Sequence, residues 1–145
     1  MDAVSYENLI EDICHQLTDA TNATVHRRNY RGASGQEHQI DIAVEYELGR
    51  VAILFLIECK SWNSKVTLEE VLVLEGRLRD IGAHKGVIVT TVGFQEGAVR
   101  LARAKGIALV VCSPKREIVV IQKRDDGRVN SGAMDEVIQN IYEKR

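Results

Sequence analysis

The sequence has few of the residues that staple small exported proteins or interrupt regular structure. Its 145 residues include one proline and three cysteines, and no two cysteines have the C-x-x-C spacing of a zinc or redox site. We therefore expect neither a disulfide framework nor a zinc site. The longest hydrophobic run, residues 51–57, is far too short to span a bilayer. These absences predict a cytoplasmic protein that is neither exported nor inserted into a membrane.

The charge is nearly balanced but unevenly distributed. Lys and Arg total 19 against 21 Asp and Glu, so the net charge is −2 and a bulk polycation is excluded. The first 24 residues contain five acidic residues and no Lys or Arg, which leaves an excess of three positive charges in the rest. This distribution permits a locally positive surface, a weak indication of nucleic-acid binding.

Apolar periodicity predicts one α/β domain over residues 1–145. Strands and helices alternate after an initial hairpin, so we expect a mixed β-sheet with helices on both faces. The expected helices are residues 5–17, 67–81, 95–105 and 135–142. The expected strands are residues 24–30, 38–46, 51–62, 87–91, 107–112 and 117–122, with a polar loop at 125–132.

The second and third of these strands flank Gly49-Arg50, which suits a two-residue type II′ hairpin turn. This turn sets the register, and the period of two then places apolar residues together on one side of the hairpin. On the other side, Asp41 is expected directly opposite Glu58, and Lys60 shares their face. The expected apolar side consists of Ile40, Ile42 and Val44 facing Cys59, Ile57 and Phe55.

Two carboxylates and a lysine at one place suggest a specific chemistry. Neighbouring carboxylates repel unless a proton or a hard divalent cation lies between them, and oxygen ligands favour magnesium or manganese. A lysine beside such a metal can hold the attacking water of a phosphodiester hydrolysis. Glu-x-Lys alone is a common tripeptide pattern, and the alternative is a solvated strand end with an ordinary Glu–Lys pair. The abrupt change from Leu54 and Leu56 to Glu58 and Lys60 on one strand face favours the metal site.

The run HQIDIAVEY…VAILFLIECKSW, followed by VTLEEVLVLEGRLRDIGAHKGVIVTTVGFQEGAVRLARAKGIALV, resembles the Mrr-like branch of the PD-(D/E)xK restriction-endonuclease superfamily. The resemblance covers about residues 5–112 and implies an αβββαβ core. Two positions depart from the common pattern. Ile40 occupies the position of the motif's proline, and Glu58 stands where many Mrr relatives have glutamine.

The resemblance also implies roles for individual residues. Asp41, Glu58 and the backbone carbonyl of Cys59 would bind Mg²⁺ or Mn²⁺, Lys60 would position the water, and Glu7 on the first helix would assist. The expected activity is metal-dependent cleavage of DNA. Two alternatives stay open: a Holliday-junction-resolvase-like nuclease that uses the same residues, and a non-catalytic nuclease-fold module that binds DNA or protein.

DNA is the expected partner, no membrane is expected, and a homodimer is left open. Arg28, Arg31 and Lys65 lie where DNA would pass the proposed site, although basic residues on an exposed strand edge are also ordinary solubilising residues.

Overall fold

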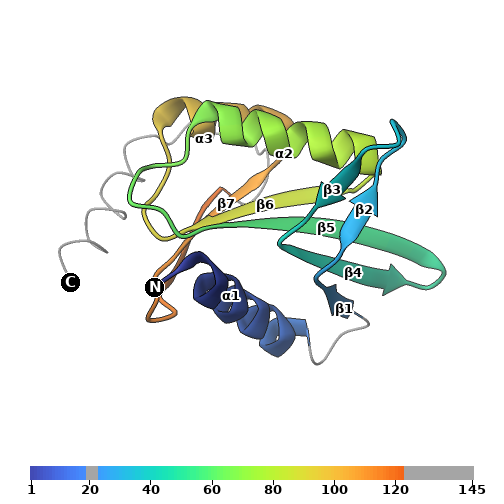
Figure 1. Cartoon of the computed structure of the whole chain (residues 1–145), viewed down its shortest axis with the longest axis horizontal. Coiled ribbons are helices and arrows are strands. Elements are labelled where there is room, and N and C mark those ends of the chain that lie inside the picture. The colour runs from blue at the N-terminus through green and yellow to red at the C-terminus, as the bar shows by residue number, and fades with distance from the viewer. Residues whose placement is uncertain (19–22, 123–145) are drawn as a thin grey trace.

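The computed structural model describes residues 1–18 and 23–122 of the chain. Two sheets and three helices make up this part, and Figure 1 shows the helices lying on both sides of the larger sheet. The expected loop 125–132 and helix 135–142 lie outside the described residues. The helices are α1 (Ala3–Thr18), α2 (Leu68–Ile81) and α3 (Glu96–Lys105). The strands are β1 (Ala23–His26), β2 (Asn29–Arg31), β3 (Glu37–Gln39), β4 (Ile42–Leu48), β5 (Val51–Lys60), β6 (Lys85–Thr90), β7 (Ala108–Cys112) and β8 (Ile118–Gln122).

The larger sheet is mixed, with strand order β1-β4-β5-β6-β7-β8. Strands β5, β6 and β7 are parallel, and the flanking pairs are antiparallel. Leaving aside the small β2–β3 ribbon, the order α1, β1, β4, β5, α2, β6 reproduces the expected αβββαβ core. Among the described helices, none is long and apolar enough to cross a membrane.

The predicted β4–β5 hairpin is confirmed. Leu48 pairs with Val51 and Ile42 pairs with Ile57, which is the register expected from a two-residue turn. Gly49 has a φ of 62°, and Arg50 is not among the residues with positive φ, as a type II′ turn requires. The turn therefore determines which side chains face each helix layer.

The expected strand 38–46 is wrong at its centre, because the chain bends at Ile40 and Asp41 between β3 and β4. The β4–β5 ladder ends at the pair of Ile42 with Ile57, so Asp41 is not a ladder partner of Glu58. Its carboxylate oxygen Oδ2 instead accepts a hydrogen bond from the Cys59 backbone N–H at 2.8 Å. The bend also moves Ile40 to the face opposite that of Ile42.

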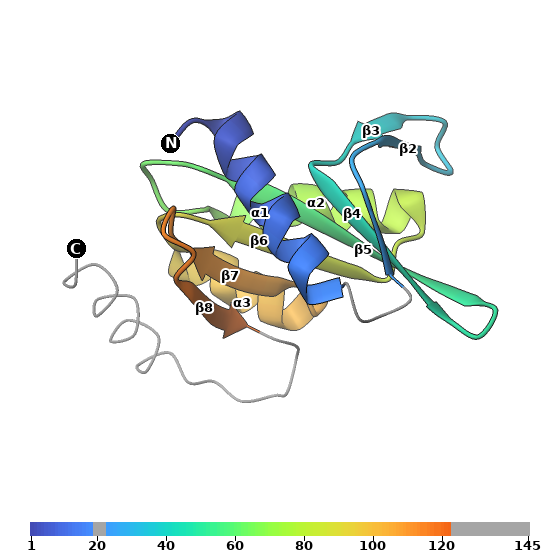
Figure 2. The ribbon, with the colours of Figure 1, turned by 90° about the horizontal axis from the view of Figure 1, so that it is seen from below.

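The expected strand 24–30 is likewise divided. Strand β1 pairs with β4 in the large sheet, whereas β2 pairs with β3 in a separate ribbon. Figure 2 shows this ribbon projecting beyond the large sheet beside the C-terminal end of α2. Asp80 of α2 anchors it, because its carboxylate accepts hydrogen bonds from the Ser34 amide at 2.9 Å and the Ser34 hydroxyl at 2.7 Å, and contacts His38 Nε2 at 2.7 Å.

Each face of the large sheet has its own apolar core. Helix α1 crosses one face (Figure 2) and buries Tyr6 and Ile10 against Ile42 and Ile57. Helices α2 and α3 cover the other face, where Leu56 is fully buried among their apolar residues. Burial of one such leucine stabilises the fold by about 1.5–3 kcal/mol. Strand β5 contributes apolar residues to both cores and therefore lies at the centre of the molecule.

Residues typical of helix caps mark the helix boundaries. The Glu70 carboxylate accepts a hydrogen bond from the Thr67 backbone N–H at 2.7 Å, and α2 begins at the next residue. Gly82 ends α2 and Gly106 ends α3, each in the left-handed conformation that favours glycine.

Candidate active site

A cavity of about 290 Å³ opens where β5 ends and the chain enters β4, next to the first turns of α1. Asp41, Glu58, Lys60 and Glu7, the four predicted catalytic residues, all line it. They come from three segments of the chain: the bend before β4, the end of β5 and helix α1. The fold therefore brings these residues together although Glu7 and Lys60 are far apart in the sequence.

Glu58 is the most buried ionisable group of the cavity, with 5% of its surface exposed. It follows Leu56 on the same face of β5, at the point where the apolar side chains of that face end. Burial, and next the nearby charge of Asp41, raise the pKa of Glu58 to about 7. Two cations oppose this rise: Arg77 donates to Oε1 from Nη1 at 2.8 Å, and Lys60 Nζ lies 4.0 Å from Oε2.

Asp41 lies beside Glu58, but its carboxylate is hydrogen-bonded to the backbone of Cys59. The hydrogen bond from the Cys59 amide holds the Asp41 carboxylate against the end of β5. The Cys59 side chain is buried in the α1 core, and burial raises the pKa of its thiol. The Cys59 thiol therefore belongs to the apolar core on the α1 side of the sheet.

Lys60 ends β5, and its side chain has two neighbours in the cavity. Besides the Glu58 carboxylate, it contacts Trp62, with Nζ 4.8 Å from the centre of the indole ring. Lys60 lies on the same side of β5 as Glu58, since alternate strand residues share a face, and Trp62, which follows the strand, lines the same cavity. The ammonium group is thus held between a carboxylate and an aromatic ring, at the mouth of the cavity.

Glu7 reaches the cavity from the first half of α1, but its carboxylate has a cationic partner. Arg27 Nη2 pairs with Glu7 Oε2, and Arg27 Nη1 also contacts Asn8 at 2.8 Å and Glu11 at 3.3 Å. In this arrangement Arg27 neutralises Glu7. Glu7 is therefore adjacent to the Asp41–Glu58 pair without being bound to either residue.

Arg77 is the residue that the sequence analysis missed. It lies three residues after the buried Leu74 of α2, so it flanks the apolar stripe of a helix that packs over β5. A basic residue at such a position was the available signal, but only the crossing of α2 over β5 identifies Glu58 as its partner. Trp62 lines the same cavity and contacts Lys60 there.

The donors suit a hard divalent cation in chemical type. Asp41, Glu58, Glu7 and the Cys59 carbonyl offer oxygen only. Burial and then the charge of Asp41 raise the pKa of Glu58, and a cation between the two carboxylates would relieve the second of these effects. Within residues 1–18 and 23–122, no group of three His, Cys, Asp or Glu side chains is already arranged to hold a metal ion. Each acid is instead bound by the protein: Asp41 by the Cys59 amide, Glu58 by Arg77 and Glu7 by Arg27.

The predicted DNA-contacting residues are placed differently from one another. Arg28 lines a second, smaller cavity of about 130 Å³ together with Glu7 and Asp41, so it lies next to the acidic site. Its guanidinium stacks over Tyr30 at 4.5 Å from the ring centre. Arg31 pairs with Glu37 across the β2–β3 ribbon at 3.4 Å, and Lys65 is exposed in the loop after β5.

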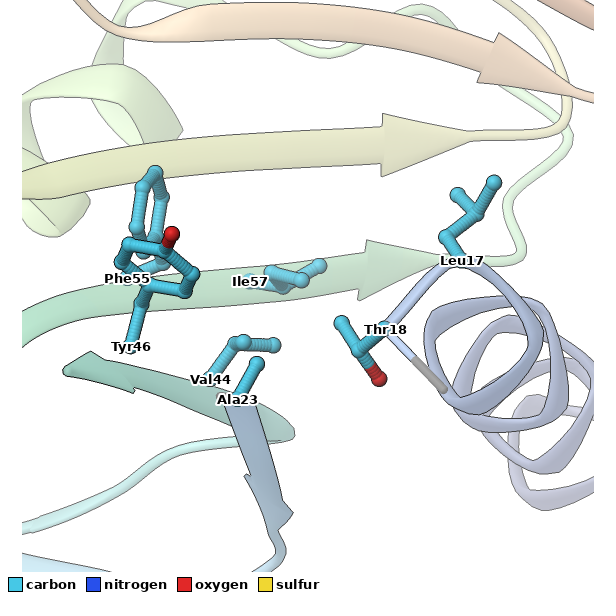
Figure 3. A pocket seen from close by; sticks show the side chains of 7 residues that line it. All are labelled: Leu17, Thr18, Ala23, Val44, Tyr46, Phe55 and Ile57. Carbon is cyan, nitrogen blue, oxygen red and sulfur yellow. The ribbon is translucent and has the colours of Figure 1, made fainter. Parts of the chain in front are cut away.

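A larger hollow of about 390 Å³ lies away from the acids, between the end of α1 and strands β4 and β5 (Figure 3). Apolar side chains such as Val44, Phe55 and Ile57 line it, and its polar groups are the hydroxyls of Thr18 and Tyr46. Among the described residues that line it, none carries a carboxylate, an ammonium or an imidazole group. Size alone therefore does not identify the reactive site here, and the chemistry of the side chains favours the smaller acidic cavity.

Comparisons with known proteins agree with this geometry. A family model described as restriction endonuclease matches residues 1–113, and no curated protein matches the chain. Among solved structures, AF1548, a protein of unknown function, has a TM-score of 0.60 at 20% identity, covering 94% of this chain and 78% of its own.

Two restriction enzymes share the fold as well. MspJI restriction endonuclease, solved in complex with a 27-mer oligonucleotide, has a TM-score of 0.53 at 18% identity, covering 96% of this chain and 32% of its own. AspBHI, a DNA modification-dependent restriction endonuclease, has a TM-score of 0.51 at 16% identity, covering 97% and 35%. The chain thus spans about a third of the length of each of these enzymes.

Proposed function

Since this chain belongs to the Mrr restriction endonuclease family, whose model matches residues 1–113, we propose that it is a DNA endonuclease that hydrolyses phosphodiester bonds with Mg²⁺ or Mn²⁺. The predicted resemblance is thereby confirmed, and so is the restriction-endonuclease-like α/β fold. The observation that carries the proposal is the convergence of Asp41, Glu58 and Lys60 on one cavity. Residues 1–145 would form a single nuclease domain of the restriction or DNA-processing type.

The proposed metal ligands are the carboxylates of Asp41 and Glu58 and the backbone carbonyl of Cys59. Bound there, a divalent cation would stabilise the negative charge that develops on the phosphate. The chain's own contribution is to keep two acids side by side, one buried and one at a strand end, with Lys60 Nζ 4.0 Å from Glu58. From that position the lysine ammonium can donate to the attacking water or to a phosphate oxygen. Glu7 would complete the acidic cluster once Arg27 releases it.

DNA would approach across the β2–β3 ribbon. Arg28 and Arg31 on the ribbon and Lys65 after β5 would contact phosphates, and Arg28 is next to the cavity. Because the net charge is −2, we expect binding to be modest and to weaken as salt is added. A cytoplasmic location is part of the proposal, and the three free thiols, Cys14, Cys59 and Cys112, support it.

The test is a cleavage assay on supercoiled, linear, methylated and branched DNA with Mg²⁺ or Mn²⁺. We expect nicking or cutting that EDTA stops. Asp41→Asn and Lys60→Ala should each reduce the rate by at least about 100-fold while the circular dichroism spectrum is unchanged. Glu47→Gln, an exposed acid near the far end of the hairpin, is the matched control and should cut normally.

The outcomes distinguish the alternatives. Cleavage confined to branched DNA would identify a resolvase-like nuclease with the same site. DNA binding without cleavage under any metal would identify a non-catalytic module and contradict the proposal. Full activity in folded Asp41→Asn or Lys60→Ala would remove these residues from the reaction.

A further inference from the structure

Within residues 1–18 and 23–122, no other element covers the outer side of α2. Leu72 and Val73 are 46% and 53% exposed there, although both are large apolar residues in a well-formed helix. Glu69, Leu72, Gly76 and Arg79 recur at three- and four-residue spacing and are all exposed, so they form one stripe along the helix. Figure 1 shows α2 along the margin of the molecule, outside the large sheet. We call these five residues the α2 outer face.

Gly76 is the unusual member of the α2 outer face. It lies in the middle of the helix and its φ is not positive, so the backbone does not require glycine. A Cβ built at Gly76 would meet no atom within 4 Å, whereas one at Gly86 would meet Leu78 Cδ1 at 2.7 Å. Glycine lowers the stability of a helix interior relative to alanine. The described part of the chain therefore gives no reason for this glycine, and a close approach from outside would give one.

The charges of the α2 outer face are self-complementary. Glu69 lies in the first turn, and Arg79, which pairs with Glu75 of the same helix but has a 74% exposed side chain, lies in the last turn. If two copies of α2 pack antiparallel about a two-fold axis, Glu69 of each copy faces Arg79 of the other. The same alignment places Leu72 opposite Gly76, so that a large side chain meets a position without one. The helix dipoles also oppose each other favourably in this arrangement.

We propose that the α2 outer face binds a second copy of this chain, with the two α2 helices antiparallel. DNA is the less suitable occupant, because Leu72 and Val73 have no charge or hydrogen-bond donor for a phosphate and the Glu69 carboxylate repels phosphates. A single helix from each copy buries less than the roughly 1,200 Å² of a standard stable interface, so the dimer should dissociate on dilution. Val73 also lines the hollow that contains Glu58 and Arg77, so the interface would adjoin the candidate active site without depending on its activity.

Sedimentation of the full chain over a dilution series tests the proposal. We expect the mass to rise with concentration from 16.2 kDa toward twice that value. Gly76→Gln adds a side chain into open space, so it should fold normally yet weaken dimerisation by at least tenfold. Leu72→Gln is the second variant and should have the same effect. Ala3→Gln, an exposed helical position on the other face of the sheet, should leave the dimer unchanged.

A charge exchange makes the test specific for the antiparallel pairing. Glu69→Arg alone and Arg79→Glu alone should each weaken the dimer, and the double variant should restore it, because both contacts are then re-formed with the charges exchanged. A mass of 16.2 kDa at every concentration would overturn the proposal. A dimer unaffected by Gly76→Gln and Leu72→Gln would equally place the interface elsewhere. If the wild type is monomeric at every concentration and Gly76→Gln loses DNA binding, this face is a DNA contact and not a dimer contact.

Discussion

Arg77 Nη1 donates a hydrogen bond to Glu58 Oε1 at 2.8 Å and thereby links helix α2 to the end of strand β5. The contact joins a partly exposed cation to a buried anion, since the Arg77 side chain is 31% exposed and that of Glu58 only 7%. A buried carboxylate is costly without a partner. In the absence of a metal ion, Arg77 therefore offsets part of the free-energy cost of burying the Glu58 carboxylate.

Replacement of Arg77 should destabilise the protein through Glu58. Arg77→Ala leaves a buried carboxylate with Lys60 as its remaining nearby cation, so we expect a loss of about 1–3 kcal/mol in the free energy of unfolding. Urea denaturation at neutral pH without divalent cations measures it. In a Glu58→Gln background the same change should cost less than about 1 kcal/mol, because the partner charge is already gone.

Arg79→Ala is the matched control, because Arg79 lies two residues away on the same helix and pairs with Glu75 on the surface. Exposed pairs of this kind contribute less than about 1 kcal/mol. If Arg77→Ala and Arg79→Ala lowered the free energy of unfolding equally, the Arg77–Glu58 contact would stabilise the fold no more than a surface ion pair does.

The parts of the site that were predictable are those determined by local chain geometry. The turn at Gly49-Arg50 and the alternation of side chains define the β4–β5 register, so the faces of Ile42 and Ile57 and the position of Glu58 near the strand end followed from the sequence. Helix α2 was likewise predictable, since the expected range 67–81 differs from the observed helix only by its N-cap, Thr67.

The parts that were not predictable depend on tertiary contacts. Asp41 lies outside the ladder, and its side chain accepts the hydrogen bond of the Cys59 backbone N–H. Such competition between a side chain and the backbone for one hydrogen bond cannot be inferred from the periodicity of the sequence. The split of the expected strand 24–30 depends on the anchoring of the β2–β3 ribbon by Asp80, which lies far away in the sequence. The partner of Glu58 depends likewise on how α2 crosses β5.

Gly32 should be essential for anchoring the β2–β3 ribbon. A Cβ at this position would overlap the Asp80 carboxylate, so Gly32→Ala must displace Asp80 from Ser34 and His38. We expect a loss of about 1–3 kcal/mol in urea denaturation. Gly97→Ala is the control, since its methyl group would make only an ordinary contact with Leu68 at 3.6 Å. If Gly32→Ala were equally costly in an Asp80→Ala background, the overlap would not be the cause.

The anchoring of the ribbon by Asp80 should depend on pH. Hydrogen bonds from His38 and then from Ser34 lower the pKa of Asp80 from 3.8 to about 2. A lowered pKa means that the folded state binds its proton less readily than the unfolded state. The contribution of Asp80 is therefore complete above about pH 4 and is lost as the pH falls toward 2.

Comparison of the wild type with Asp80→Asn isolates this effect. The wild type should be more stable at pH 5 to 7, and the difference should shrink steadily between about pH 4 and pH 2. Denaturant midpoints at a series of pH values measure the difference, and Asp12→Asn, an exposed acid on α1, serves as the control. A difference that stays constant down to pH 2 would contradict the assigned hydrogen bonds.

Trp62 should report metal binding directly, because it is the single tryptophan of the chain and lines the cavity with Asp41 and Glu58. Mn²⁺ is paramagnetic and quenches a nearby indole, so titration with Mn²⁺ should give saturable quenching that EDTA reverses. This readout is independent of DNA cleavage. It therefore separates a failure to bind metal from a failure of catalysis.

The variants decide whether the quenching arises at the proposed site. Asp41→Asn and Glu58→Gln each remove one anionic oxygen ligand, so each should raise the apparent Kd for Mn²⁺ at least tenfold, about 1.4 kcal/mol. Glu47→Gln, exposed near the far end of the hairpin, should quench like the wild type. Because burial and Asp41 raise the pKa of Glu58 to about 7, protons compete with the metal near neutrality, and the wild-type affinity should increase from about pH 6 to pH 8. Saturable quenching that both Asp41→Asn and Glu58→Gln retain would place the metal away from these carboxylates, and the nuclease site would then have to be sought elsewhere.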